Sequence, residues 1–168
     1  MKNRFVNEHK MLIRFADQIL VQCPKCSGLA KVIIPQNAVG YADPYVWDCL
    51  SRRVLCTKCS FMKEVHPRRG PHNDWKFNFT LSKGSSAVDW FFGLPLYLQT
   101  PFRGHILWAF NFKHLDYLER YIRAEIRESA PYYLSIESTL PKWIKLSKNR
   151  DDLLKAIYKI KSSFHSNS

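Results

Sequence analysis

Long apolar runs are missing from this 168-residue chain. Charged residues or proline interrupt every hydrophobic stretch before it reaches the ~20 residues that a membrane-spanning helix needs. The first residues, Met1-Lys2-Asn3-Arg4-Phe5, enter no continuous apolar region and show no small-residue cleavage site, which argues against a secretory signal. We therefore expect a cytoplasmic protein that does not contact membrane, in a compartment where thiols stay reduced.

Recognised catalytic motifs are missing as well. The sequence has no nucleophile elbow, no P-loop and no H-E-x-x-H motif. An enzyme that uses His105 or Asp89 in an aromatic pocket would require these side chains to converge in one cleft. Nothing in the sequence indicates that they do. His114 is expected to be an ordinary surface residue on the first turn of a helix. We expect a protein that is not an enzyme.

Acidic residues are scarce: 14 Asp and Glu stand against 26 Lys and Arg, giving a formal charge of +12. Such an excess favours anionic partners, such as nucleic acid or an acidic protein surface, although a lysine-rich exterior without a partner is equally compatible with it. The chain is 46% hydrophobic and 14% aromatic, which is enough to build a buried core. Its length suits one compact domain, or one core carrying a small metal-stapled module.

Four of the five cysteines form two C-x-x-C pairs, Cys23-Pro24-Lys25-Cys26 and Cys56-Thr57-Lys58-Cys59. A C-x-x-C turn places two sulfurs on one side of a tight knuckle, and two facing knuckles complete the tetrahedral S₄ set that Zn²⁺ prefers. Both pairs have lysine just before the second cysteine, which suggests two equivalent halves of one site. Because four thiolates leave no position for water, the sequence predicts one structural Zn²⁺ rather than a catalytic one.

Other uses of these cysteines stay open. Disulfides are disfavoured in a reducing compartment, and a thioredoxin-like motif would need a C-x-x-C at a helix start within a βαβ unit. Redox or iron–sulfur chemistry remains the alternative to zinc. His66 or His72 could replace a ligand in principle, and Cys49, among apolar residues, is expected to be a small buried hydrophobe.

The expected fold class is α+β: a zinc ribbon of antiparallel strands, extended by further strands and followed by a C-terminal helical segment. Five segments are expected along the chain: an N-terminal helix or extension (1–20), the zinc ribbon (21–67), an aromatic-rich β segment continuous with the ribbon (68–110), C-terminal helices (111–162) and a polar tail (163–168).

Short β-branched or aromatic runs flank the cysteines and recur further on, predicting strands at 20–22, 31–34, 53–55, 61–65, 75–81, 94–98 and 105–110. Apolar residues at helical spacing predict helices over about 6–19, from an N-cap at Asn111 to the stop at Ala130-Pro131, over 142–148, and from about Asn149 onward.

Two groups of basic residues are candidate contacts for nucleic acid or another partner. The candidates are Arg52, Arg53, Lys58, Lys63, Arg68 and Arg69 around the second knuckle, and Lys142, Lys145, Lys148 and Arg150 in the tail. Zinc ribbons present basic tips to nucleic acid, and aromatic neighbours such as Phe61 or Trp75 can stack on unpaired bases. The leading hypothesis is therefore a non-enzymatic zinc protein that binds nucleic acid. The alternative is a protein-interaction module, an adaptor or an inhibitor, that docks on an acidic partner through aromatic and arginine side chains.

The chain resembles a known group of proteins along most of its length. The similarity is carried by the residues of the ribbon and by the runs 92–101, 104–111, 114–121 and 140–151, of which Leu107-Trp108-Ala109 is the most specific part. These are similar to bacterial transcription factor IIB-type zinc-ribbon-containing proteins of poorly characterised function. The resemblance implies a bacterial zinc ribbon with a helical tail and no established reaction. Some members carry extra cysteines in the turn that Phe102-Arg103 occupy here, which argues against a second metal role in this chain.

Overall fold

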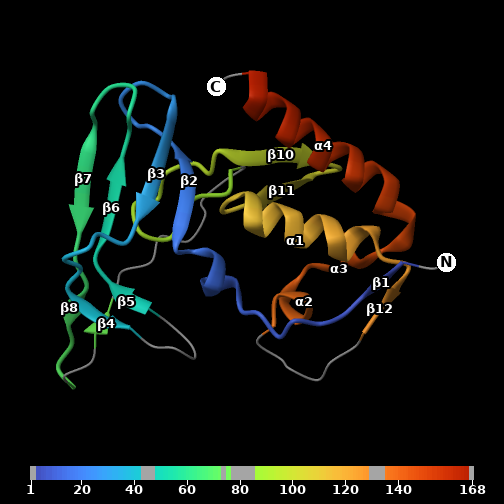
Figure 1. Cartoon of the computed structure of the whole chain (residues 1–168), viewed down its shortest axis with the longest axis horizontal. Coiled ribbons are helices and arrows are strands. Elements are labelled where there is room, and N and C mark those ends of the chain that lie inside the picture. The colour runs from blue at the N-terminus through green and yellow to red at the C-terminus, as the bar shows by residue number, and fades with distance from the viewer. Residues whose placement is uncertain (1–2, 43–47, 73–74, 77–85, 129–134, 167–168) are drawn as a thin grey trace.

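The computed structural model describes residues 3–42, 48–72, 75–76, 86–128 and 135–166. It combines antiparallel sheets with helices, the longest of which closes the chain (Figure 1). The expected α+β class is therefore confirmed. Within the described residues, no helix is long and apolar enough to cross a membrane.

A four-stranded antiparallel sheet lies on the left of Figure 1. Its strands follow the order β2 (Gln18–Gln22), β3 (Leu29–Ile33), β6 (Arg52–Leu55) and β7 (Met62–Val65). Alternate side chains share one face, so Ile19 lies opposite Val32, and Val32 opposite Val54, with all three fully buried. The strands expected beside the cysteines are confirmed, and each C-x-x-C pair occupies a hairpin turn, between β2 and β3 or between β6 and β7.

Two short hairpins adjoin the end of this sheet that lies away from the C-x-x-C turns (Figure 1). They pair β4 (Gly40–Ala42) with β5 (Asp48–Leu50), and β8 (Arg68–Arg69) with β9 (Trp75–Lys76). Gly40 has a φ of +129°, and a Cβ there would come within 1.8 Å of the Cys49 carbonyl oxygen, so the close approach of β5 requires glycine. The strand expected over 75–81 begins as β9, and residues 77–81 lie outside the described part.

The segment 94–97 joins the sheet to the rest of the molecule. The N–H of Gln22 donates to Pro95 O (2.8 Å) and the N–H of Tyr97 donates to Leu20 O (2.9 Å). These bonds cover the outer edge of β2. The strand expected at 94–98 is displaced: this segment makes only isolated bridges, and β10 (Leu98–Phe102) starts where it was expected to end. β10 pairs with β11 (His105–Ala109), which confirms the strand expected at 105–110.

Helices form the right of the molecule (Figure 1). α1 (Phe112–Arg123) follows β11, and α4 (Arg150–Ser166) packs on α1 and β10. Between them lie α2 (Ile136–Thr139), which the sequence did not predict, α3 (Lys142–Lys145) and the 3₁₀ turn η2 (Ser147–Asn149). The expected N-cap of α1 is confirmed, since Asn111 Oδ1 accepts from the N–H of His114. α4 begins where expected but continues to Ser166, through part of the expected polar tail.

α1 ends seven residues earlier than the predicted stop at Ala130, because two arginines bind its last carbonyl groups. Arg127 donates to Tyr121 O (3.0 Å) and Ile122 O (3.2 Å), and Arg150 donates to Ile122 O (3.2 Å) and Ala124 O (3.1 Å). The chain then turns into β12 (Ile126–Arg127), which pairs in parallel with β1 (Arg4–Phe5).

The helix expected over 6–19 is wrong. Only a 3₁₀ turn, η1 (Leu12–Phe15), forms there, and His9 has a positive φ of 52°. The reason is tertiary packing: an extended N-terminus lets Phe5 pack edge-on against Tyr117 and Tyr121 of α1, with ring centroids 5.4 and 5.3 Å away.

Candidate metal centre

The two C-x-x-C turns have the same local structure. The N–H of Cys23 donates to Gly28 O (2.8 Å), and the N–H of Cys56 donates to Phe61 O at the equivalent place (2.9 Å). The residue after each second cysteine, Ser27 or Ser60, adopts a left-handed backbone with a φ of 57°. Because this conformation is uncommon for serine, its occurrence at both positions indicates that the two turns are equivalent knuckles.

The knuckles bring the four thiols into one cluster. The Sγ atoms of Cys23 and Cys59 are 3.6 Å apart, and those of Cys26 and Cys56 are 3.7 Å apart. All four sulfurs lie within 4.8 Å of one another, and no disulfide joins them. Cys23 and Cys56 are buried, whereas Cys26 and Cys59 are half-buried on the outer side. The cluster can hold a metal ion.

Without a cation, the thiols of Cys23 and Cys59 do not both ionise near neutral pH. Burial raises the pKa of Cys23, but hydrogen bonds from the backbone of Cys26 and Lys25 and from neighbouring thiols lower it to about 7. The backbone N–H of Phe61 lowers the pKa of Cys59, but burial and the other three thiols outweigh it and raise the pKa to about 12. A thiolate at one cysteine therefore disfavours ionisation of its neighbour, and a bound cation offsets this repulsion.

The other residues considered as ligands do not join this cluster. Among the described residues, the four cysteines are the only group of cysteine, histidine and acidic side chains placed to share an ion. The Nδ1 of His66 is 2.8 Å from Ser51 Oγ instead. Cys49 lies on β5 at the far end of the ribbon and is half-buried rather than fully buried.

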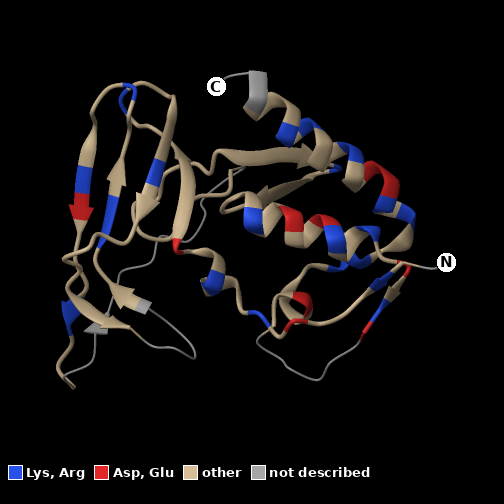
Figure 2. Cartoon of the chain, in the orientation of Figure 1, with Lys and Arg blue, Asp and Glu red and all other residues tan. Residues whose placement is uncertain are grey.

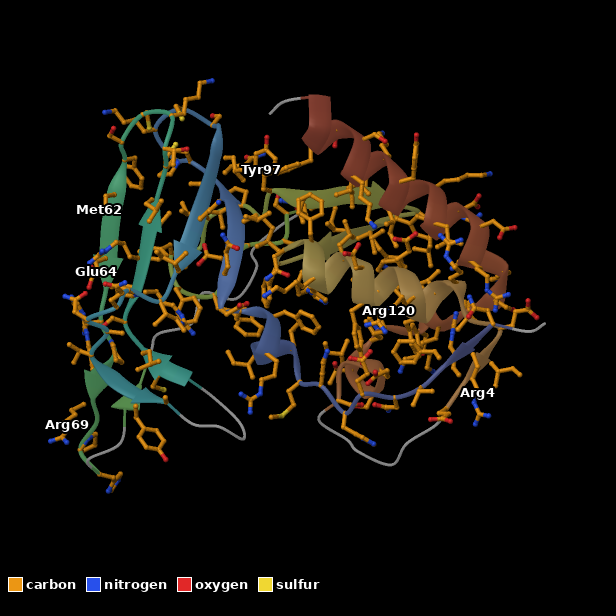
Figure 3. All side chains as sticks on the ribbon, in the orientation of Figure 1. Arg4, Met62, Glu64, Arg69, Tyr97 and Arg120 are labelled. Atoms are coloured by element: carbon orange, nitrogen blue, oxygen red, sulfur yellow. The ribbon has the colours of Figure 1, made fainter. Side chains whose placement is uncertain are left out.

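Exposed basic side chains follow the outer strand of the sheet. β7 is the last strand of the sheet order and connects the second knuckle with β8. Lys58 at the knuckle, Lys63 on β7, and Arg68 and Arg69 on β8 are all exposed. Figure 2 shows basic positions along β7 and β8, and Figure 3 labels Arg69. These four residues are called the basic edge below.

The predicted tail group does not extend the basic edge. Lys142 and Lys148 are exposed, but α3 and η2 lie on the other side of the molecule from the knuckles (Figure 1). Lys145 is half-buried, and its Nζ donates to Ser138 O at 3.3 Å.

Three predicted contact arginines are engaged within the fold. Arg52 is only 1% exposed, and its guanidinium lies 4.5 Å from the centroid of the Phe91 ring. Arg150 caps α1, as described above. A surface contact is therefore wrong for Arg52, because its burial depends on a partner far away in sequence; Arg150 is half-buried, and its contact remains a prediction. Arg53 is half-buried and forms an ion pair with Glu64 (2.7 Å).

Asp89 and His105, the candidate catalytic groups, do not converge. Asp89 is fully buried and accepts from the backbone N–H groups of Phe91, Phe92 and Leu94 at 2.7–2.9 Å, so it holds a turn together. Burial raises its pKa, although these three donors oppose the rise. His105 is exposed and stacks flat on Trp143, with ring centroids 4.9 Å apart.

His114 was expected on the surface, and this is wrong. It is 3% exposed and stacks on Phe15, with centroids 5.1 Å apart. The backbone N–H of Phe110 donates to its Nδ1 (3.2 Å). Burial lowers the pKa of His114 to about 3, so the ring is neutral and carries its proton on Nε2.

Acid is expected to destabilise the protein through His114. In the unfolded chain this group takes up a proton near its ordinary pKa of 6.5, whereas in the folded chain it does so near pH 3. Its contribution is therefore complete above about pH 6.5 and is lost as the pH falls towards 3, by about 2 kcal/mol at pH 5. Urea unfolding at pH 7 and pH 5 should show this. The His114→Gln variant should lose about 2 kcal/mol less between the two pH values; an equal loss would contradict the assignment.

Comparisons with protein-family models, curated proteins and solved structures find no match for this chain.

Proposed function

We propose that this protein is a non-enzymatic zinc ribbon whose basic edge binds nucleic acid. The zinc assignment rests on geometry: four sulfurs at about 2.3 Å from a tetrahedral ion are about 3.8 Å apart, close to the 3.6 and 3.7 Å separations of the two facing pairs. Two equivalent knuckles at the ends of two adjoining hairpins, within one antiparallel sheet, support the zinc-ribbon assignment. A closed thiolate set leaves no position for a reacting water, which supports a structural ion.

The basic edge is the observation that carries the proposal. With four thiolates and one Zn²⁺ counted, the formal charge falls from +12 to about +10, so association with a polyanion is favoured. The basic edge places four exposed cations along one extended stretch, and the ion pair between Arg53 and Glu64 neutralises the acidic residue among them. Cations on an extended stretch can follow a phosphate backbone, whereas scattered ones cannot.

Aromatic rings lie beside the knuckles as well. A hollow of about 560 Å³ is lined by Ser27, Gly28, Thr57 and Lys58 of the knuckles and by Tyr97 and Phe164. Tyr97, between the ribbon and α4 in Figure 3, is half-buried and packs edge-on against Phe164 at 5.9 Å. Unpaired bases stack on such rings beside a basic groove, so we propose single-stranded nucleic acid as the preferred form.

Salt-dependent binding tests this proposal. Fluorescence anisotropy with labelled 20-nucleotide single- and double-stranded DNA and RNA, between 50 and 200 mM KCl, should show log K falling linearly with log[KCl], with a slope of about −0.7 to −0.9 per phosphate contact. The Lys58→Glu/Lys63→Glu variant should bind at least about tenfold more weakly and show a smaller salt slope.

The matched control is Lys142→Glu/Lys148→Glu, which makes the same change in net charge on the tail group. It should retain affinity within about threefold, because those lysines lie away from the basic edge. Absence of binding at 50 mM KCl, or equal weakening by both variants, would contradict the proposal.

An acidic protein partner is the second candidate. Met62 on β7 is 66% exposed, and β7 is the outer strand of the sheet. An acidic peptide could add to this edge as a further strand. A partner that remains bound at high salt would favour this reading over nucleic acid.

A further inference from the structure

A half-open cavity of about 320 Å³ lies between β11, α1 and the α2–α3 corner, and none of the cysteines lines it. Trp108 and Trp143 contribute to its walls, and Leu140 lies between α2 and α3; most of the remaining lining is aliphatic. A volume near 300 Å³ that is mostly apolar and carries few polar groups is typical of small-molecule sites.

His114 is the buried polar group of this cavity. Its Nδ1 accepts from the backbone N–H of Phe110, so the proton is on Nε2. Among the described residues, Nε2 makes no hydrogen bond to a nitrogen, oxygen or sulfur atom. Nor is Nε2 one of the fully buried side-chain atoms that lack a hydrogen-bond partner. His114 is 3% exposed and lines the cavity. We therefore place the Nε2–H donor at the cavity wall.

The other polar side chains that line the cavity are Thr139 and His105, and neither offers a second donor deep inside it. Thr139 turns its hydroxyl back to α2, where it donates to Ile136 O (2.9 Å), so this hydroxyl proton is already used within the helix. His105 is exposed at the mouth, stacked on Trp143. Among the described lining residues there is no lysine, arginine, aspartate or glutamate. A charged ligand would find no counter-charge there, so the site suits a neutral one.

We propose that this cavity binds a small, uncharged, mostly apolar molecule that presents one carbonyl-type oxygen to the Nε2–H of His114. The two tryptophans and the aliphatic side chains give the site an apolar lining, and the single donor fixes the orientation of the ligand. This site is independent of the metal centre and of the basic edge. Its ligand is therefore a separate property of the protein.

A matched pair of probes tests this site in the full-length, metal-loaded chain. We choose 2-acetylnaphthalene, which has the carbonyl, and 2-ethylnaphthalene, which has nearly the same shape without it. Both should shift the NMR signals of Trp108 and Trp143. Only the ketone should shift the ¹⁵Nε2 signal of His114, because only the ketone accepts its hydrogen bond.

Two variants complete the test. Leu140→Trp, which fills the cavity from its rim, should weaken both probes at least about tenfold. His114→Phe removes the donor and should weaken the ketone about five- to tenfold relative to the hydrocarbon. The His114 ¹⁵Nε2 measurement needs no variant, so it stands even if His114→Phe does not fold. If neither probe binds, if Leu140→Trp binds them unchanged, or if both probes shift ¹⁵Nε2 equally, the proposal is wrong.

Discussion

Cys56→Ser is expected to release the metal ion and to unfold the β2–β3–β6–β7 sheet. The reason is the size of the metal contribution: a structural Zn²⁺ supplies about 10–16 kcal/mol of apparent binding energy in small domains, against a total stability of about 5–15 kcal/mol for a typical domain. The inner face of the sheet buries the aliphatic side chains of Ile19, Val32 and Val54, together with Arg52, whose guanidinium lies over the ring of Phe91. The thiol cluster joins the two hairpin turns, so loss of the ion removes this cross-link.

Cys49→Ser is the matched control. Cys49 carries the same chemical change but lies on β5, outside the thiol cluster. It should keep one zinc per chain and an intact sheet, as followed by metal analysis and by amide hydrogen exchange of β3 and β6. If Cys56→Ser keeps its metal, or keeps full exchange protection without it, the structural role of the ion is refuted.

Phe110→Ala is expected to destabilise the molecule by about 3–5 kcal/mol, the usual range for removing a buried phenylalanine. Phe110 is fully buried, and its ring meets Trp90 and Trp108 with centroids 4.8 and 5.2 Å away. Its carbonyl accepts from the N–H of Leu20 in β2 (2.7 Å), so the residue lies where the sheet and the helical part share one core. The cavity left by alanine would loosen both.

Thermal and urea unfolding measure this effect. A loss of 3–5 kcal/mol corresponds to a Tm lower by roughly 6–20 °C for a chain of this size. Tyr158→Ala is the control: Tyr158 is 73% exposed on α4, and its removal should change stability by about 0.5 kcal/mol or less. If Phe110→Ala unfolds the helices while the sheet keeps its stability, the two parts do not form one cooperative unit.

The strands beside the cysteines could be predicted because their pattern is local. Each C-x-x-C turn fixes a hairpin, and the runs around Val32 and Val54 alternate as half-buried strands do. The same holds for α1 and α4, whose apolar stripes and N-terminal residues are close together in sequence. The thiol cluster was predicted for the same reason, since its residues are marked by spacing alone.

The rest depended on contacts between distant residues. The early end of α1 is set by Arg127 and Arg150, and nothing local marks arginine as a helix cap. His114 is buried by Phe15, almost a hundred residues away, although its own helix position looked exposed. Arg52 was counted as a surface contact because charged residues are rarely buried, and the ring of Phe91 that covers it lies in another part of the chain. In these cases tertiary packing overrides the local pattern.

X-ray absorption spectroscopy of the purified protein, combined with metal analysis, tests the central claim most directly. We expect one zinc per chain with four sulfur neighbours at about 2.3 Å and no nitrogen or oxygen neighbour. Iron at the site, a nitrogen or oxygen ligand, or a metal-free protein with disulfide-bonded cysteines and an intact sheet would contradict the closed zinc centre.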